Sequence, residues 1–237
     1  MRLSASEGLM ETQVEQALSS SVLNSLPQNM RDLVLADAMR VDIPAGSILY
    51  REGGPPRCGL LVSGLARVFV AAPDGRQATI RYMRPGSLSG ASLVVLGTAA
   101  DVRVQAVTDV VGLLINVSAL RQLARQEADV AWSLATEVAR SQDEIMRAFS
   151  TRVFGSVRQR LARHLLDLAA ARLGPGEPLL APVTQQELAD AVGSTREVVA
   201  RELGSLRRAG LVDTGRGGVG LLDPAALHAV ADPGPEL

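Results

Sequence analysis

The stretch that decides the fold runs from Val183 to Val212 and reads VTQQELADAVGSTREVVARELGSLRRAGLV. Its apolar residues repeat at helical spacing in two short runs, with Gly193 between them. Thr184-Gln-Gln-Glu187 and Ser194-Thr-Arg-Glu197 each have the form of a capping box, in which a hydroxyl and a carboxylate satisfy the first backbone N–H groups of a helix. The stretch therefore predicts two helices joined by a tight turn.

We expect the first helix over about 185–192 and the second over about 195–209, with Gly210 ending the second. A helical wheel gives the second helix two unlike faces. The aliphatic face, which we expect to lie in the core, holds Val199, Leu203 and Leu206. The opposite face holds Glu197, Arg201, Gly204 and Arg208, with Arg196 in the first turn.

The charged face suits the major groove of DNA. A recognition helix enters this groove with its N-terminal residues against the base edges. Arginine can bond guanine O6 and N7, and a carboxylate can accept from cytosine N4. Glu197 and Arg201 are also four residues apart, so they could instead form an ion pair with each other on a solvent-exposed face of the helix. The alternative is therefore a charged amphipathic helix in an ordinary helical domain.

The sequence on either side predicts a winged helix-turn-helix. A helix is expected over 156–173, because the glycines and prolines of 174–178 end it. Residues 210–231 predict a strand, a glycine-rich hairpin with Arg216 at its tip, a second strand and a last helix. Residues 194–216 hold five arginines and three acidic residues, so positive charge is concentrated at the proposed groove face.

Short β-prone runs dominate residues 41–115, and glycine or turn residues separate most of them. Asp74-Gly75 lies between two strand-like runs, which is a typical hairpin signal. Several short strands at this spacing predict a sandwich or small barrel. Residues 85–101 interrupt the pattern and are expected to form a loop with a short helix. Arg81 and Arg84, on either side of Tyr82, are expected on a solvated face.

Helix formers replace glycine from about residue 117 to residue 150. Apolar and small residues here alternate at spacings of three and four, as in a coiled coil, and they are Ala131, Leu134, Val138, Ser141, Ile145 and Ala148. A helix with one narrow apolar stripe needs a partner. That partner is either its own β-domain or, as the charged flanks favour, the same helix of a second subunit. Trp132 lies off the stripe and is expected to pack on the β-domain.

Composition excludes several kinds of site. The chain has 237 residues, a net charge of −1 and 24 basic residues, all of them arginine. Cys58 is the only cysteine, which excludes an internal disulfide and a four-cysteine iron–sulfur cluster held by one chain. Neither Cys58 nor the two histidines, His164 and His228, have the spacing of a zinc site. We expect no metal and no cofactor, and we expect Cys58 to be a buried structural residue.

No catalytic constellation stands out, since no nucleophile, acid–base pair or glycine-rich phosphate loop occurs at a usable spacing. The protein is therefore not expected to be an enzyme. The N-terminus lacks the basic and apolar regions of a signal peptide, and no apolar run approaches 18 residues. No membrane association and a cytoplasmic location are expected by default.

A β-rich domain, a long helix and a winged helix-turn-helix, in that order, resemble the Crp/Fnr family of bacterial transcription regulators. The resemblance covers about residues 20–230, and its strongest motif is the helix-turn-helix stretch. GSILYREGG and GLLVSGLARVFV, which begin at Gly46 and Gly59, are similar to the opening of the family's cyclic-nucleotide-binding-like domain. The resemblance implies an α+β fold in four parts: a helical lead-in (1–39), a double-stranded β-roll or jelly-roll sensor domain (40–118), helices including a dimerisation helix (119–153), and a winged helix-turn-helix DNA-binding domain (154–237).

The resemblance also implies a homodimer on a palindromic operator in double-stranded DNA. Arg196, Glu197 and Arg201 match base-contacting positions, and Thr184 matches a position that contacts backbone phosphate. Helix N-termini and side-chain donors make such phosphate contacts, so the predicted DNA-binding set is completed by Ser194, Thr195 and Arg216. Surface residues of the β-domain could contact RNA polymerase in an activator.

The cyclic-nucleotide cassette is degenerate by comparison with the family. In nucleotide-binding members a glutamate binds the ribose and an arginine neutralises the cyclic phosphate. The corresponding positions here are Gly90, Ala91, Ala100, Asp101 and Arg103. The glutamate is replaced by Ala91, and burying a phosphate without a cation beside a carboxylate is unfavourable. The positions that contact adenine fall near Ile145 and Met146, which are apolar, so we expect no binding of cyclic AMP.

Two possibilities remain for the sensor domain. It binds an unknown small-molecule effector in an apolar pocket, or the regulator is controlled by its own abundance. The alternative function for the whole chain is a ligand-binding regulatory module that acts through a protein partner instead of DNA.

Overall fold

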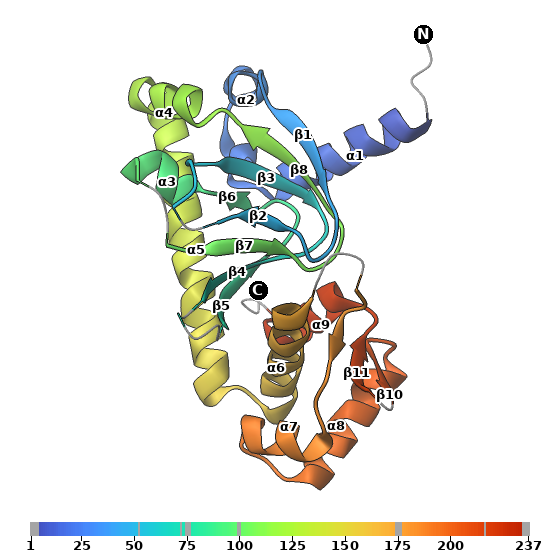
Figure 1. Ribbon diagram of the computed structural model, residues 1–237. Helices are drawn as coiled ribbons and strands as arrows, with labels where there is room; N and C mark the ends of the chain where they lie inside the picture. The colour runs from blue at the N-terminus through green and yellow to red at the C-terminus, as the bar shows by residue number, and fades with distance from the viewer. Residues whose placement is uncertain are drawn as a thin grey trace.

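The computed structural model describes residues 5–51, 53–71, 73, 77–98, 101–173, 177–215 and 217–233, with side chains from residue 11 onward. It has two halves, an N-terminal β-roll and a C-terminal helical domain with a small sheet (Figure 1). A long helix, α5 (Ala128–Phe154), runs beside the β-roll and reaches the second half. Within these residues no helix is both long and apolar enough to cross a lipid bilayer.

Helices precede the β-roll, as the sequence predicts. They are α1 (Ala5–Ser20), the 3-10 helix η1 (Val22–Ser25) and α2 (Gln28–Leu35). The Ser21 hydroxyl caps η1 by accepting from the Leu23 N–H at 3.3 Å. Val22 and Leu23 are buried and join the core that α1 forms with the β-roll.

The β-roll consists of two four-stranded antiparallel sheets, which confirms the predicted fold class. One sheet has the order β1-β8-β3-β6 and the other β2-β7-β4-β5. Their strands are β1 (Met39–Ile43), β2 (Ile48–Tyr50), β3 (Cys58–Ser63), β4 (Ala66–Ala71), β5 (Gln77–Met83), β6 (Leu88–Ser89), β7 (Arg103–Ala106) and β8 (Val110–Ile115). The predicted short helix between β6 and β7 is α3 (Ala91–Leu96).

Strands β4 and β5 pair from Ala66↔Met83 to Ala71↔Gln77, as expected for a hairpin. The turn residues Asp74 and Gly75 lie outside the described residues. The register shifts within the pair, because Val68 opposes Arg81 whereas Phe69 opposes Thr79. One residue of β5, Ile80, is therefore extra, as in a β-bulge.

Helix α4 (Val117–Gln126) and α5 divide the predicted helical region at Glu127. Part of α5 is buried within the protomer, and its buried residues are Val130, Ser133, Leu134, Glu137 and Ala148. The predicted stripe is consequently split. Its members Leu134 and Ala148 are buried within the protomer, whereas Val138 and Ile145 are exposed, with Met146, Phe149 and Val153 farther along the helix.

Two side-chain expectations for the β-roll are wrong. The Trp132 side chain does not pack on the β-roll, because 75% of its surface is exposed. Arg81 is not on a solvated face, since it is buried and its Nη1 lies 2.7 Å from Glu144 Oε2 of α5. A residue 63 positions away thus compensates the charge of Arg81.

The C-terminal half is a winged helix-turn-helix, as predicted. Its helices are α6 (Val157–Arg172), α7 (Gln185–Val192), α8 (Arg196–Arg208) and α9 (Pro224–Ala231). Its sheet has the order β10-β11-β9, formed by β10 (Val212–Gly215), β11 (Gly218–Leu221) and a third strand that the sequence did not predict, β9 (Leu180–Ala181). All four helices bury aliphatic residues in one core, which includes Leu161, Leu165, Leu188, Val199, Leu203, Leu206 and Leu227.

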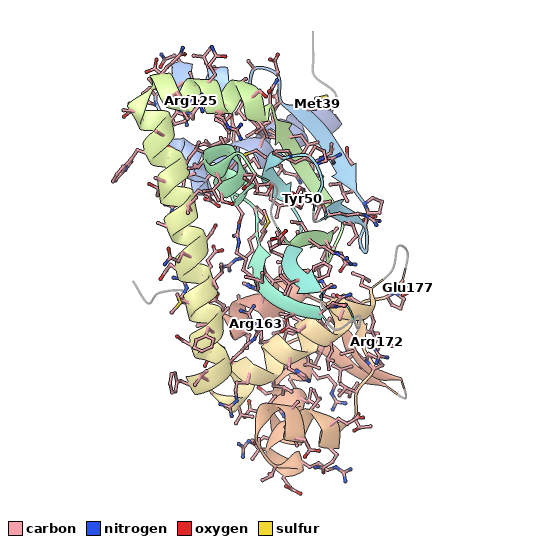
Figure 2. The ribbon with its side chains drawn as sticks, turned by 60° about the vertical axis from the view of Figure 1, so that its left-hand side comes forward. Met39, Tyr50, Arg125, Arg163, Arg172 and Glu177 are labelled. Atoms are coloured by element: carbon pink, nitrogen blue, oxygen red, sulfur yellow. The ribbon has the colours of Figure 1, made fainter. Side chains whose placement is uncertain are left out.

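Polar contacts join the two halves. Arg152 of α5 donates to Asp167 of α6 at 3.1 Å and to the Thr79 carbonyl of β5 at 2.7 Å. Gln105 of β7 donates to the carbonyl of Leu173, just after α6, at 3.0 Å. Arg163 of α6 is 3% exposed, and its guanidinium carbon lies 5.5 Å from the centroid of the Tyr82 ring. Figure 2 shows Arg163 where the β-roll meets the C-terminal half.

Candidate nucleic-acid interface

The first predicted capping box is present at the start of α7. The Glu187 N–H donates to the Thr184 hydroxyl at 3.2 Å, and the Thr184 N–H donates to Glu187 Oε2 at 2.8 Å. The Thr184 hydroxyl also donates to Glu187 Oε2 at 2.9 Å. These bonds lower the pKa of Glu187 below its ordinary value, so its carboxylate is ionised at neutral pH. The predicted phosphate contact from Thr184 would require its hydroxyl to turn away from Glu187.

Gly193 makes the turn between α7 and α8. Its φ of +61° is in the left-handed region, which glycine adopts without a steric penalty. The Ser194 N–H donates to the Ala189 carbonyl at 2.9 Å, which is the long hydrogen bond of a Schellman motif. Ser194 therefore completes the end of α7.

The second predicted capping box is wrong because the N-cap of α8 is Thr195. The Thr195 hydroxyl accepts from the Val198 N–H at 3.4 Å, so the helix begins at Arg196, one residue later than a Ser194 cap would place it. The backbone N–H of Glu197 itself and the nearby Thr195 hydroxyl instead lower the pKa of Glu197. At neutral pH this side chain is a carboxylate that can only accept hydrogen bonds.

Helix α8 has the two predicted faces. Val199, Leu203 and Leu206 are buried in the core, and Arg196, Glu197 and Arg201 are exposed. The Arg201 side chain is 70% exposed, and its Nε lies 3.6 Å from Glu202 Oε1. Its ion pair in this structure is thus with the adjacent residue and not with Glu197. Such an exposed pair holds the guanidinium weakly.

Gly204 leaves space in the middle of the charged face. A Cβ added to Gly204 would have no atom within 4 Å outside its own helical backbone and adjacent residues. Packing inside the protein therefore does not require a glycine here, although glycine destabilises a helix interior. A close approach by a molecule outside the chain would explain it.

Three arginines outside the predicted set of functional residues hold the motif in place. Arg160 of α6 donates to the Val192 carbonyl at the end of α7 at 3.0 Å. Arg158 of α6 donates to the Ser205 hydroxyl of α8 at 2.7 Å. Arg207 donates to the Thr214 hydroxyl of the wing at 3.4 Å. Nothing in the local sequence distinguishes these arginines, because their partners are 7 to 47 positions away.

The wing and the start of α7 enclose a hollow of about 420 Å³. Thr184 and Gln185 line one side, and Thr214, Gly217 and Gly218 line the other. Figure 1 shows α7 and α8 at the end of the domain away from the β-roll. The predicted wing-tip residue Arg216 lies outside the described residues.

The described cassette positions do not all face one cavity. Gly90 precedes α3 with φ of +76°, and an added Cβ would collide with the Arg57 carbonyl. Ala91 is buried, Asp101 is exposed and Arg103 begins β7. Gly90 and Ala91 line a cavity of the β-roll, whereas Asp101 and Arg103 are not among its lining residues. Ala100 lies outside the described residues.

Cys58 is buried, as predicted. It pairs with Ile115 in the sheet, and burial, with nearby Glu137, raises the pKa of its thiol to about 12. The reactive thiolate is therefore scarce at neutral pH. The environment supports a packing role.

Comparison with known proteins agrees with this architecture. Residues 40–127 match the family described as a cyclic nucleotide-binding domain, and residues 159–230 match the Crp-like helix-turn-helix domain. The transcriptional regulator LdrP of Thermus thermophilus is 36% identical over 174 residues, which cover 72% of this chain and 85% of LdrP. The cyclic AMP receptor protein of the same species is 30% identical over 213 residues, which cover 90% of this chain and 97% of that protein.

The structure of FixK2 from Bradyrhizobium japonicum has a similar fold, with a TM-score of 0.52 and 22% identity over 82% of this chain and 98% of FixK2. The sequence relatives are transcription regulators and not enzymes. Their similarity extends across both the β-roll and the helix-turn-helix. The chain therefore belongs to the Crp/Fnr family of DNA-binding transcription regulators.

Proposed function

We propose that this regulator acts as a homodimer that binds a palindromic operator and places α8 of each subunit in the major groove. One observation carries the proposal: α8 buries Val199, Leu203 and Leu206 and exposes Arg196, Glu197 and Arg201 at its N-terminal end. A recognition helix presents its N-terminal residues to the base edges in this manner. Two such helices related by twofold symmetry would bind half-sites one turn of the duplex apart.

The predicted DNA-binding residues have two kinds of role in this proposal, contact with bases and contact with phosphates. Arg196 and Arg201 donate to guanine, and ionised Glu197 accepts from cytosine N4. The remaining residues contact the phosphate backbone, and they are Thr184, Ser194 and Thr195 near the two helix starts and Arg216 in the wing. These contacts would set the position of the protein without sequence preference.

The exposed apolar residues of α5 support a homodimer. Val138, Ile145, Phe149 and Val153 recur at spacings of four and seven and are exposed in the single chain. We call these four residues the α5 stripe. A contiguous apolar stripe on a long helix is typical of a helix that pairs with its own copy. The surface of the β-roll would remain available to RNA polymerase.

The proposed organisation assigns 1–39 to the lead-in, 40–118 to the sensor domain, 119–153 to the dimerisation segment and 154–237 to DNA binding. Cyclic AMP is not the proposed effector, although one relative is a cyclic AMP receptor protein. Ala91 cannot bind the ribose as a glutamate would, and no arginine at the cassette positions lines the cavity.

Selection of bound duplexes from a random pool tests this function. We expect enrichment of a palindrome and a steep fall in affinity with salt, because several phosphate contacts release counterions. Arg201→Ala should weaken binding to the selected duplex by about 1–3 kcal/mol and relax base preference in each half-site. Arg40→Ala, a matched loss of an exposed arginine on β1, should leave both unchanged.

Two outcomes would contradict the proposal. If no sequence is enriched and duplex binding has no steep salt dependence, the C-terminal domain acts on a protein partner instead. If Arg201→Ala leaves affinity and base preference at the level of Arg40→Ala, the assignment of base contacts is wrong.

A further inference from the structure

The β-roll contains a cavity of about 630 Å³ that is closed on one side by α5. Its walls come from both sheets and are largely aliphatic, with Leu60, Leu61, Val68, Ile80, Met83 and Val104 among the lining residues. Figure 2 places Tyr50, another lining residue, within the β-roll. Cavities of this size with apolar walls and a few polar groups are typical of small-molecule sites.

The charges around the cavity are compensated except at one position. Among the described lining residues only Asp42, Arg57 and Arg81 are charged. Asp42 pairs with Arg40 at 2.6 Å, and Arg81 pairs with Glu144 at 2.7 Å. Arg57 has no hydrogen bond or ion pair with its side chain in the described part of the chain, and it is exposed. Arg57, at the mouth of the cavity, is therefore the one uncompensated charge among the described lining residues.

The surroundings of Arg57 suit a compact anionic group. Gly90 lines the cavity beside it, because its missing side chain lets it approach the Arg57 backbone, and Ser92, two residues later, is an exposed lining residue. A carboxylate at this mouth could accept from the guanidinium fork and from the Ser92 hydroxyl. Because Arg57 is exposed, the anionic group would stay partly hydrated and would avoid the full cost of burying a charge.

We propose that this cavity binds a small apolar monocarboxylate, with its carboxylate on Arg57 and its hydrocarbon body between the two sheets and α5. The walls offer extensive aliphatic contact to a hydrocarbon, and their uncharged polar side chains are those of Tyr50, Ser89, Ser92, Ser141 and Gln142. Because a polar group of the ligand that found no partner there would cost free energy, a ligand with one anionic group and a hydrocarbon body suits this lining.

The same cavity touches the proposed dimer helix. Val138 and Ile145 line the cavity and also belong to the α5 stripe. A bound hydrocarbon would contact these side chains from within the β-roll, so its binding would change how they are presented to a second subunit. This consequence rests on the proposed function, whereas the binding of the acid does not.

Calorimetric titration of the full chain tests the site with three probes: decanoate, 1-decanol and cyclic AMP. Decanoate and 1-decanol share the hydrocarbon and differ in charge. We expect one decanoate per chain, weaker 1-decanol and no cyclic AMP. Arg57→Gln should weaken decanoate about tenfold or more, since a hydrogen bond to a charged group is lost, and should leave 1-decanol unchanged. The matched control Arg125→Gln, which changes an exposed arginine of α4 that does not line the cavity, should leave both unchanged.

Val68→Phe, which adds bulk to the cavity wall, should weaken the binding of both decanoate and 1-decanol. A cooperative thermal unfolding transition would verify that this variant is folded. The proposal is overturned if decanoate does not bind, if Arg57→Gln leaves its affinity unchanged, or if cyclic AMP binds more tightly than decanoate. Selection of an operator by the same protein would then still support the proposed function, because that assay does not depend on this ligand.

Discussion

Tyr82 of β5 donates its phenolic hydroxyl to Asp167 of α6 at 2.9 Å, and this hydrogen bond joins the sensor domain to the DNA-binding domain. The Tyr82 ring is buried and lies against His228 of α9, with ring centroids 5.0 Å apart. Burial, followed by the charge of Asp167, raises the pKa of Tyr82 well above its ordinary value. The phenol thus remains protonated and able to donate throughout the physiological range.

We expect Tyr82→Phe to loosen this junction. The change removes one hydrogen bond to a carboxylate and keeps the ring, so the junction should lose about 1–2 kcal/mol. Hydrogen exchange should then accelerate at the amides of α6. Tyr50→Phe, which removes a hydroxyl bonded to Gly54 within the β-roll, is the matched control and should leave α6 unchanged. Equal protection of α6 in Tyr82→Phe and the wild type would show that the bond does not hold the two domains together.

Two adjacent hydroxyl residues precede α8, and only one of them caps it. Thr195→Ala should lower the free energy of unfolding by about 1 kcal/mol, because the Val198 N–H loses its acceptor. Ser194→Ala should have a much smaller effect on folding, since Ser194 contributes its backbone N–H to the turn. Urea denaturation of the two variants measures the difference. A larger loss in Ser194→Ala would identify Ser194 as the cap instead.

Gly204→Ala should raise the stability of the protein and lower its affinity for DNA. Gly204→Ala meets no neighbouring atom within 4 Å, so it should stabilise the folded protein by about 0.5–1 kcal/mol. The added methyl group would nevertheless lie on the face proposed to enter the groove, and affinity for the selected duplex should fall. Thermal denaturation and a duplex titration of the same sample give the two values. Unchanged affinity would place the bases away from Gly204.

Stability should depend on pH through Glu137 of α5. Burial raises the pKa of this carboxyl to about 7, despite the opposing charge of Arg81 and the hydrogen bond from the Leu88 N–H at 3.2 Å. Between about pH 4.5 and pH 7 the folded state therefore binds a proton that the unfolded state has released. The contribution of Glu137 to the free energy of unfolding should fall as pH rises through this range.

Glu137→Gln keeps an acceptor for Leu88 and removes the titration. Relative to the wild type it should gain stability as pH rises from 4.5 to 8, by roughly 2–3 kcal/mol in total. Because burial lowers the pKa of His228 to about 3, His228 gives the wild-type curve an opposite slope below pH 6.5. The difference between variant and wild type, measured by urea denaturation across pH, isolates Glu137. A difference that is flat with pH would contradict the assignment.

The sequence predicted the helix-turn-helix closely because its signals are local. Thr184, Glu187 and Gly193 act on residues within one helical turn of themselves, and their spacing alone places α7. The error at Ser194 is also local, because the adjacent hydroxyls of Ser194 and Thr195 could each cap α8. In the structure the Ser194 N–H donates to the Ala189 carbonyl in the turn, and Thr195 is the cap. Spacing cannot decide that competition.

Other features depend on partners distant in the chain, so the sequence alone could not place them. Arg81 is buried because Glu144 reaches it from α5, and nothing near Arg81 in the sequence indicates this. Trp132 is exposed because the buried face of α5 is set by the β-roll and passes through Ser133 and Leu134 instead. The periodicity of α5 predicts a stripe but not which part of it the protomer covers. Arg57 can be identified as the unpaired cation of the cavity only from the structure, which pairs Asp42 with Arg40 and Arg81 with Glu144.

The extra residue in β5 limits which insertions and deletions the gene can tolerate. Ile80, Arg81 and Met83 face the cavity, whereas Tyr82 between them reaches Asp167 of the other domain. Removing Ile80 would restore regular pairing with β4, whereas an insertion of one residue between Arg81 and Tyr82 would shift the alternation by one step and turn Tyr82 inward, toward the hydrocarbon walls. Such an insertion would break the interdomain hydrogen bond and obstruct the cavity at the same time, so homologues should tolerate the loss of a residue at the bulge better than a gain beside Tyr82.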